Sequence, residues 1–217
     1  MDAAQGVGRA VEDRVREANH RIANQLSLLT GMIQLQIDGL AHGPQSLPRE
    51  TVRDLLRNTA ARIVAIGNLN RQLSSANGAL IDLCPFLSAT RDELIASLAA
   101  GGRLKVSQAL GPGCHVSGEQ ASVLCLVMNE IIVNAMKYAR PSGELVSLRL
   151  VCTGESEHIV VEFSDDGVGL PPDFDETAHG RVGFKLIRNL VRQIGAELHL
   201  KTGGQGLGFR IGKRLTC

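Results

Sequence analysis

Apolar residues in the first third of the chain recur every three or four positions, the spacing of one face of a helix. One such pattern runs from about residue 11 to 40 and another from about residue 50 to 75, with Gly43, Pro44 and Pro48 between them. The apolar positions are Val11, Val15, Ala18, Ile22, Leu26, Leu29, Ile33 and Leu40, then Val52, Leu55, Leu56, Ile63, Ile66, Leu69 and Leu73. Two long helices with a short connection predict an antiparallel helical hairpin.

The apolar face of the first helix is wide, because Leu28, Met32 and Leu35 add a second row. One hairpin cannot cover such faces alone, whereas dimerisation into a four-helix bundle would. We therefore expect residues 1–77 to form a helical hairpin within a homodimer.

The pattern changes after the segment SSANG at residues 74–78. Ser117 and Gln120 resemble a capping box that opens a long helix. Strands are predicted near residues 79–83, 104–110, 145–154, 158–167, 196–203 and 206–215, and helices near 88–99, 117–139 and 183–194. We expect residues 78–217 to form an α/β sandwich with helices on one face of a mixed sheet.

Composition narrows the classes of function. The net charge of +1 gives no electrostatic reason to expect nucleic acid or an anionic membrane as a partner. No apolar run approaches the length of a membrane span, and no signal peptide is recognised. The five cysteines lack CxxC spacing, which argues against a zinc site or a disulfide framework. A cytoplasmic protein is expected.

His20 is the first candidate for chemistry. At about 100° per residue it lies roughly 200° from Ala18 and Ile22, so it is predicted to face away from the hairpin core. Glu17 and Asn24 lie one turn before and after on the same face. A carboxylate beside an imidazole can favour its reactive tautomer and take up its proton. On this helix alone, an ordinary surface histidine is the simpler interpretation.

The long helix predicted near residues 117–139 carries a second candidate group in NEIIVNAMKYA. Glu130, Asn134 and Lys137 are spaced i, i+4 and i+7, which predicts one polar face opposite an apolar one. Their side chains suit water or metal positioning, magnesium ligation and phosphate neutralisation, respectively. An ordinary polar surface stripe fits the same spacing about equally well.

FSDDGVGLP, about thirty residues later, favours the chemical interpretation. A strand ends at Asp165 and passes into Gly167 and Gly169, which allow a tight turn and a close approach to a flat ligand. A carboxylate at the end of a strand can accept a hydrogen bond from an exocyclic amine such as that of adenine.

These two segments resemble the N-box and first glycine box of the ATPase superfamily shared by DNA gyrase, the Hsp-ninety chaperones, MutL and sensor histidine kinases. ANHRIANQL resembles the phosphoacceptor box of the HWE and related short-lid histidine kinases. The resemblance covers about residues 14–212 in the family's order. It implies a kinase that uses ATP and Mg²⁺.

The resemblance also implies roles for individual residues. His20 would be the phosphoacceptor and Glu130 a catalytic residue. Glu17, one turn from His20, is the second catalytic candidate because of its position beside the imidazole. Asn134 would bind the magnesium ion. The nucleotide would be bound by Asn134, Lys137, Tyr138, Asp165, Gly167, Gly169 and Gly183. Arg181, at a position where the sequence departs from the family pattern, is a further candidate for a phosphate contact. Asp165 would contact adenine, and the helix that Gly183 opens would present amides to phosphates.

The implied function is ATP-dependent autophosphorylation on a histidine, followed by transfer to an aspartate of a response-regulator receiver domain. A separate sensor protein is a further expected partner. The alternative is a dimeric histidine phosphotransferase with a degenerate nucleotide pocket, favoured by Arg181 and Val182, which differ from the usual second glycine box. A serine kinase of the anti-sigma type and a structural dimeric scaffold are more distant alternatives.

Overall fold

The structure is a computed structural model. It describes residues 46–74, 80–97, 103–140, 142–155, 158–171, 174, 182–202 and 206–214, together with 15, 16, 18, 19, 22–24, 26, 27, 29–31, 33, 34, 37, 38 and 40. Three residues of the expected site, Glu17, His20 and Arg181, lie outside the described residues.

A five-stranded mixed sheet forms one layer of the molecule, with the strand order β2-β4-β5-β7-β6. Only the pairing of β2 with β4 is parallel; the other neighbours are antiparallel. The strands are β2 (Leu104–Leu110), β4 (Val146–Glu155), β5 (His158–Asp165), β6 (Glu197–Thr202) and β7 (Leu207–Arg214). The expected mixed sheet with helices on one side is confirmed.

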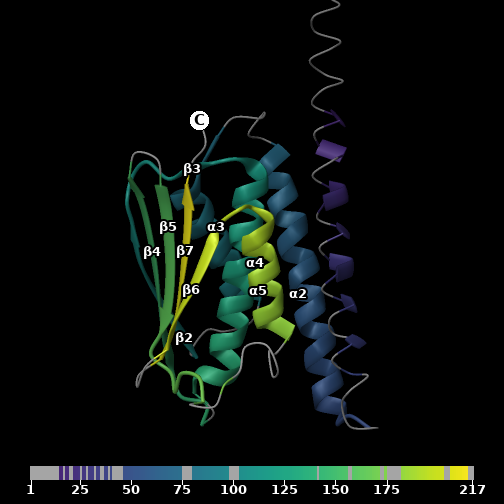
Figure 1. The fold of residues 1–217 in the computed structure, drawn as a ribbon. Coiled ribbons are helices and arrows are strands. Elements are labelled where there is room, and N and C mark those ends of the chain that lie inside the picture. Colours follow the sequence, from purple (N-terminus) through teal and green to yellow (C-terminus); the bar gives the residue numbers. More distant parts are fainter. Residues whose placement is uncertain are drawn as a thin grey trace, which may run out of the picture.

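The helices form further layers on one side of this sheet (Figure 1). α4 (Gly118–Asn134) and α5 (Val182–Gln193) lie between the sheet and α2 (Arg49–Ser74). The expected capping box is present, because Gln120 N–H donates to Ser117 Oγ and Ser117 N–H donates to Gln120 Oε1. α4 ends in a short π-helix, η1 (Ala135–Ala139), which the sequence pattern did not predict.

α4 is buried on all sides from Ala121 to Val133, so the predicted polar face of this helix is wrong at Glu130. The Glu130 side chain is only 1% exposed. The reason is tertiary: α2, α3 and α5 all pack against α4, which a local spacing cannot reveal. Within the described residues, Gly118–Ala139 is long and apolar enough to cross a membrane, but 78% of its apolar window is buried inside the protein.

A two-stranded sheet of β1 (Ile81–Asp82) and β3 (His115–Val116) lies beside α3 (Leu83–Ser97). The predicted boundaries were wrong here: the strand ends earlier and the helix begins five residues earlier than expected. The Cys84 N–H donates to Asp82 Oδ1 (3.2 Å), which caps the helix start. Leu83, Phe86 and Leu87 are buried one turn apart, so packing holds this first turn in the core.

α2 begins and ends within one residue of the predicted second helix. The described residues between 15 and 40 are almost all helical and run alongside it (Figure 1). Their apolar side chains are partly exposed in a single chain, as Ile22 (44%) and Leu26 (56%) show. This agrees with the expectation that one hairpin cannot cover these faces alone. Leu29 packs against the core and Ile66 of α2 joins it. The direction in which His20 points stays a prediction.

Replacing Ser117 by alanine should destabilise the protein by about 1 kcal/mol, because α4 loses its N-cap acceptor. Urea unfolding should show a lower midpoint with an unchanged slope. The control is Ser107→Ala, at an exposed position of β2, which should leave the midpoint at the wild-type value. Equal midpoints for the two variants would contradict the capping role.

Candidate nucleotide-binding site

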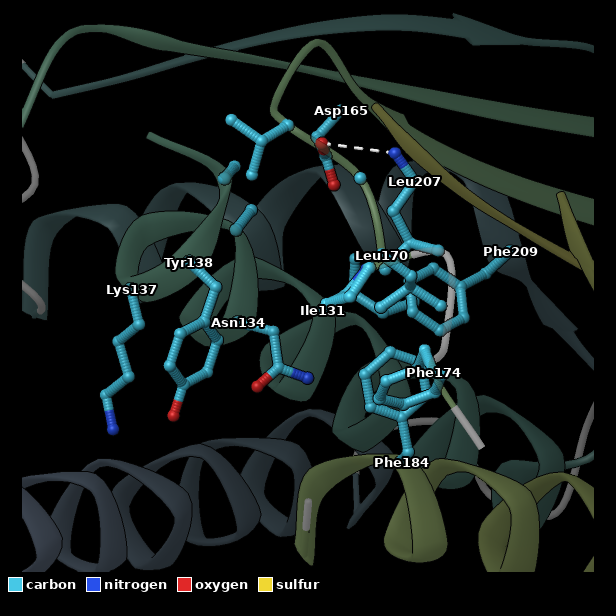
Figure 2. A pocket seen from close by; sticks show the side chains of 15 residues that line it. Ile131, Asn134, Lys137, Tyr138, Asp165, Leu170, Phe174, Phe184, Leu207 and Phe209 are labelled. Carbon is cyan, nitrogen blue, oxygen red and sulfur yellow. Dashed lines mark hydrogen bonds between the residues drawn. The ribbon is translucent and has the colours of Figure 1, made fainter. Parts of the chain in front are cut away.

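A cavity of about 320 Å³ opens where the end of α4, the end of β5, the start of β7 and the start of α5 come together. Figure 2 shows its polar and apolar side chains. The lining comprises Ile131, Asn134, Ala135, Lys137, Tyr138, Ala139, Asp165, Val168, Gly169, Leu170, Pro171, Phe174, Phe184, Leu207 and Phe209. Five residues named from the sequence are therefore brought together: Asn134, Lys137, Tyr138, Asp165 and Gly169.

Two backbone N–H groups hold the side chain of Asp165 in place at the end of β5. The N–H groups of Gly167 (2.9 Å) and Leu207 (3.3 Å) both donate to Asp165 Oδ1. No described residue donates a hydrogen bond to Oδ2, so this oxygen can accept from a ligand in the cavity. Desolvation by burial is the largest influence on the pKa of Asp165 and raises it, although the two N–H donors oppose the shift.

Two glycines beside Asp165 are required by space and backbone conformation. A Cβ at Gly167 would lie 2.6 Å from the Cα and the carbonyl oxygen of Ala139. Gly169 has a φ of +72°, a conformation that L residues rarely adopt. Gly167 is buried behind the lining and brings the loop against η1, whereas Gly169 reaches the cavity itself.

Asn134 stands at the junction of α4 and η1. Its Nδ2 is buried and has no hydrogen-bond partner among the described residues. A Cβ at Gly183, in the first turn of α5, would lie 3.0 Å from Nδ2 and 3.2 Å from Oδ1. Gly183 is outside the lining but lets α5 approach the amide. A buried N–H donor without an acceptor is costly, so Nδ2 fits a site that a ligand completes.

Lys137 and Tyr138 are exposed residues of η1 and extend from it on the same side as Asn134 (Figure 2). π-helical turns occur frequently at functional sites because they shift side chains from regular helical spacing. Here the turn places an ammonium group at the rim of the cavity that contains Asp165. Glu130, in contrast, lies one turn earlier in the core and does not line the cavity. Its catalytic role stays a prediction.

The apolar part of the cavity was missed by the sequence analysis. Phe184 of α5 lies between Phe174 and Phe209, with ring centroids 5.2 and 5.6 Å away. The chain has only five phenylalanines, and three of them meet here. Leu170 and Leu207 lie against the same cluster (Figure 2). The scarcity of aromatics was visible in the sequence, but it could not show that distant segments converge.

Together, the cavity offers an apolar surface for a flat ring, a carboxylate for an amine and, at the other end, an amide and an ammonium group. Apolar pockets with a few converging polar groups are typical of small-ligand sites. The arrangement suits a nucleotide, with its base near Asp165 and its phosphates near Asn134 and Lys137.

Asp166, next to Asp165, serves the turn instead of the cavity. Ser147 N–H donates to its Oδ1 (2.9 Å), and Arg140 Nη2 donates to its backbone oxygen (2.7 Å). Its side chain does not line the cavity. Asp166 therefore stabilises the turn, whereas Asp165 faces the cavity.

Two family models match the chain. The model described as "Histidine kinase" (HisKA_2) matches residues 17–98. The model described as "Histidine kinase-, DNA gyrase B-, and HSP90-like ATPase" (HATPase_c) matches residues 119–216. The second match contains every residue that lines the cavity.

Individual proteins are similar over most of the chain. "Blue-light-activated histidine kinase 2" of Erythrobacter litoralis is 29% identical over 216 residues, which are 95% of this chain and 59% of the relative. "Sensor histidine kinase PdtaS" of Mycobacterium tuberculosis is 21% identical over 178 residues, 82% of this chain and 34% of the relative. The chain therefore spans only part of the length of these relatives.

The fold is also found among solved structures. The histidine kinase domain of an Erythrobacter litoralis blue-light activated histidine kinase superposes with a TM-score of 0.68 at 25% identity, covering 96% of this chain and 94% of that domain. The histidine kinase AdeS of Acinetobacter baumannii superposes with a TM-score of 0.54 at 16% identity, covering 91% and 98%, and supports the fold alone.

Asp165→Asn should weaken the binding of an ATP analogue by at least about tenfold, because an amide in place of the carboxylate loses a charge-assisted hydrogen bond. Calorimetric titration measures this. The matched control is Asp166→Asn, which changes the neighbouring carboxylate and should retain affinity. Similar losses in both variants would contradict the assignment of the base-binding role to Asp165.

The affinity of the wild-type protein for the analogue should also fall on acidification. The carboxylate binds in its charged form, and burial raises the pKa of Asp165. Protonation, and with it the loss of affinity, should therefore begin at a higher pH than for an ordinary aspartate. Titrations across a pH series test this, and a loss confined to the ordinary aspartate range would contradict it.

Proposed function

Because the chain belongs to the histidine kinases that combine a HisKA_2 region with a HATPase_c ATPase domain, we propose that it transfers the γ-phosphoryl group of ATP to its own His20. The observation that carries this proposal is the convergence of Asp165, Asn134 and Lys137 on one cavity. A phosphotransferase that only relays phosphate between receiver domains has no need of such a cavity.

Different residues of the cavity would bind the base and the phosphates of ATP. Asp165 would accept from the exocyclic amine of adenine while the ring packs against the phenylalanine cluster. Lys137 and the N-terminal amides of α5 would neutralise the phosphates. The Oδ1 atom of Asn134 suits a Mg²⁺ ligand, since this ion prefers oxygen ligands. Nδ2, which has no partner among the described residues, could donate to a phosphate oxygen. When bound, Mg²⁺ would supply charge neutralisation to the phosphates.

The chemical step is a displacement at phosphorus. A nitrogen of the His20 imidazole would form a bond to the γ-phosphorus while the bond to the β–γ bridging oxygen breaks, and ADP leaves. Glu17 would take up the proton that the imidazole loses. The transition state of such transfers is loose, so the protein acts mainly by positioning and charge neutralisation.

The phosphoryl group would then pass to an aspartate on the receiver domain of a response regulator. Such relays operate in the cytoplasm, where we place the protein, and a separate sensor protein would supply the signal. We propose the receiver domain because a phosphohistidine formed by a histidine kinase needs an acceptor for its phosphoryl group. We propose the sensor protein as the source of the signal.

A homodimer is proposed from the apolar surface of α2. Leu56 is 66% exposed and Ile63 50% exposed, and Val52 and Val64 are also exposed. Extended apolar faces of this kind mark interaction sites. A second copy of the hairpin would cover this surface as a four-helix bundle.

Incubation with labelled ATP and Mg²⁺ should yield an acid-labile, base-stable phosphoryl group on wild-type protein and none on His20→Ala. The matched control, His199→Ala, alters an exposed histidine of β6 and should be labelled like the wild type. If the His20→Ala variant is still labelled, autophosphorylation on His20 is contradicted. Absence of Mg²⁺-dependent ATP binding would instead favour the phosphotransferase alternative.

Leu56→Glu should raise the dimer dissociation constant about 100-fold. Each leucine contributes about 1.5 kcal/mol on burial, and two-fold symmetry counts the change twice. Sedimentation velocity measures the shift. Leu145→Glu, at a similarly exposed leucine before β4, should leave the association unchanged. A monomeric wild type would contradict the dimer.

A further inference from the structure

Three buried cysteines from distant parts of the sequence lie close together where α3, the turn before β3 and strand β4 meet. Cys84 belongs to the first turn of α3, Cys114 precedes β3 and Cys152 lies within β4. Their Sγ atoms all lie within 4.8 Å of one another, and those of Cys114 and Cys152 are 3.0 Å apart. Among the described residues, no other group of three His, Cys, Asp or Glu side chains is arranged to hold a metal ion.

The backbone around the cluster holds these segments together independently of the thiols. Leu83 N–H donates to Cys114 O (2.8 Å) and Gly111 N–H donates to Cys152 O (2.8 Å). A Cβ at Gly154 would lie 2.8 Å from Gly113 O, so the turn before β3 fits closely against β4. The three sulfurs are therefore brought together by the fold, so a ligand would not have to gather distant segments of the chain.

We propose that Cys84, Cys114 and Cys152 form a binding site for a soft, thiophilic metal ion, Cu(I) in preference to Zn(II). Thiolates select such ions. A trigonal ion with metal–sulfur bonds of about 2.3 Å needs sulfur–sulfur distances of about 4 Å. The 4.8 Å limit of the cluster allows this spacing, and binding would move the Sγ atoms of Cys114 and Cys152, now 3.0 Å apart, away from each other by about 1 Å. Structural Zn(II) almost always takes four ligands, and the described residues supply only three of the usual kind.

Burial favours this role over a redox switch. Cys114 and Cys152 have no exposed surface, and Cys84 is 8% exposed. Redox-sensing cysteines are accessible, whereas a closed site is typical of a structural metal. The single charge of Cu(I) would offset the charge of one buried thiolate.

The site would join the start of α3, the turn before β3 and strand β4 without touching the nucleotide. Cys152 pairs with Val161 in the sheet, while Asp165 pairs with Leu148, four residues away along β4. At about 3.3 Å per residue, the two sites are about 13 Å apart along the strand. Metal binding should thus raise stability by linkage and leave ATP affinity unchanged.

The test is an anaerobic titration of the reduced protein with Cu(I) in competition with a chromophoric chelator, repeated with Zn(II). Wild type should bind one Cu(I) per chain more tightly than Zn(II), and its melting temperature should rise. Cys84→Ala, Cys114→Ala and Cys152→Ala should each lose at least about 100-fold in affinity. The control is Cys125→Ala, which removes a buried cysteine outside the cluster and should bind like the wild type.

Retained binding of an ATP analogue by the cluster variants would verify their folding and keep the result separate from the proposed kinase activity. Cu(I) binding at wild-type strength in a folded cluster variant would overturn the proposal. So would tighter binding of Zn(II), or a reduced wild type that binds neither ion specifically.

Discussion

The burial of α4 on every side is the constraint on which the rest of the structure depends. The helix is covered by the sheet on one side and by α2, α3 and α5 on the others, so it has little freedom to shift or rotate. Asn134 ends this fixed helix, and η1 continues it to Lys137. The distance from these groups to Asp165 is therefore set by the packing of the core rather than by a flexible loop. A site built in this way is preorganised for its ligand.

Much of the fold could be predicted because it follows from local chemistry. β2 has the bounds expected from its sequence, and the capping box at Ser117 fixes the start of α4. The start of α3 could not be predicted in the same way, since it depends on Asp82 as an acceptor and on the burial of Leu83. Glu130 shows the same limit: three neighbouring helices decide its burial, and none of them is visible in the spacing of α4.

The candidate site also contains residues that could be predicted from the sequence and residues that could not. Asp165, Asn134 and Lys137 were predicted because short segments carry them in a characteristic order. The aromatic cluster was not, since Phe174, Phe184 and Phe209 come from three separate segments and each is unremarkable in its own sequence context. The hairpin adds a third limit, because a periodic apolar pattern cannot show whether a residue is covered by its own chain or by another. Ile22 and Leu26 have the pattern of core residues and are exposed within one chain.

The position of Ile66 links the hairpin to the ATPase domain. It belongs to α2, yet only 4% of it is exposed, and it is part of the core that surrounds α4. Sliding α2 away from α4 would uncover this side chain at a cost of about 2 kcal/mol. A displacement of α2 that uncovers Ile66 would therefore also remove a packing partner from the core around the helix that ends at Asn134.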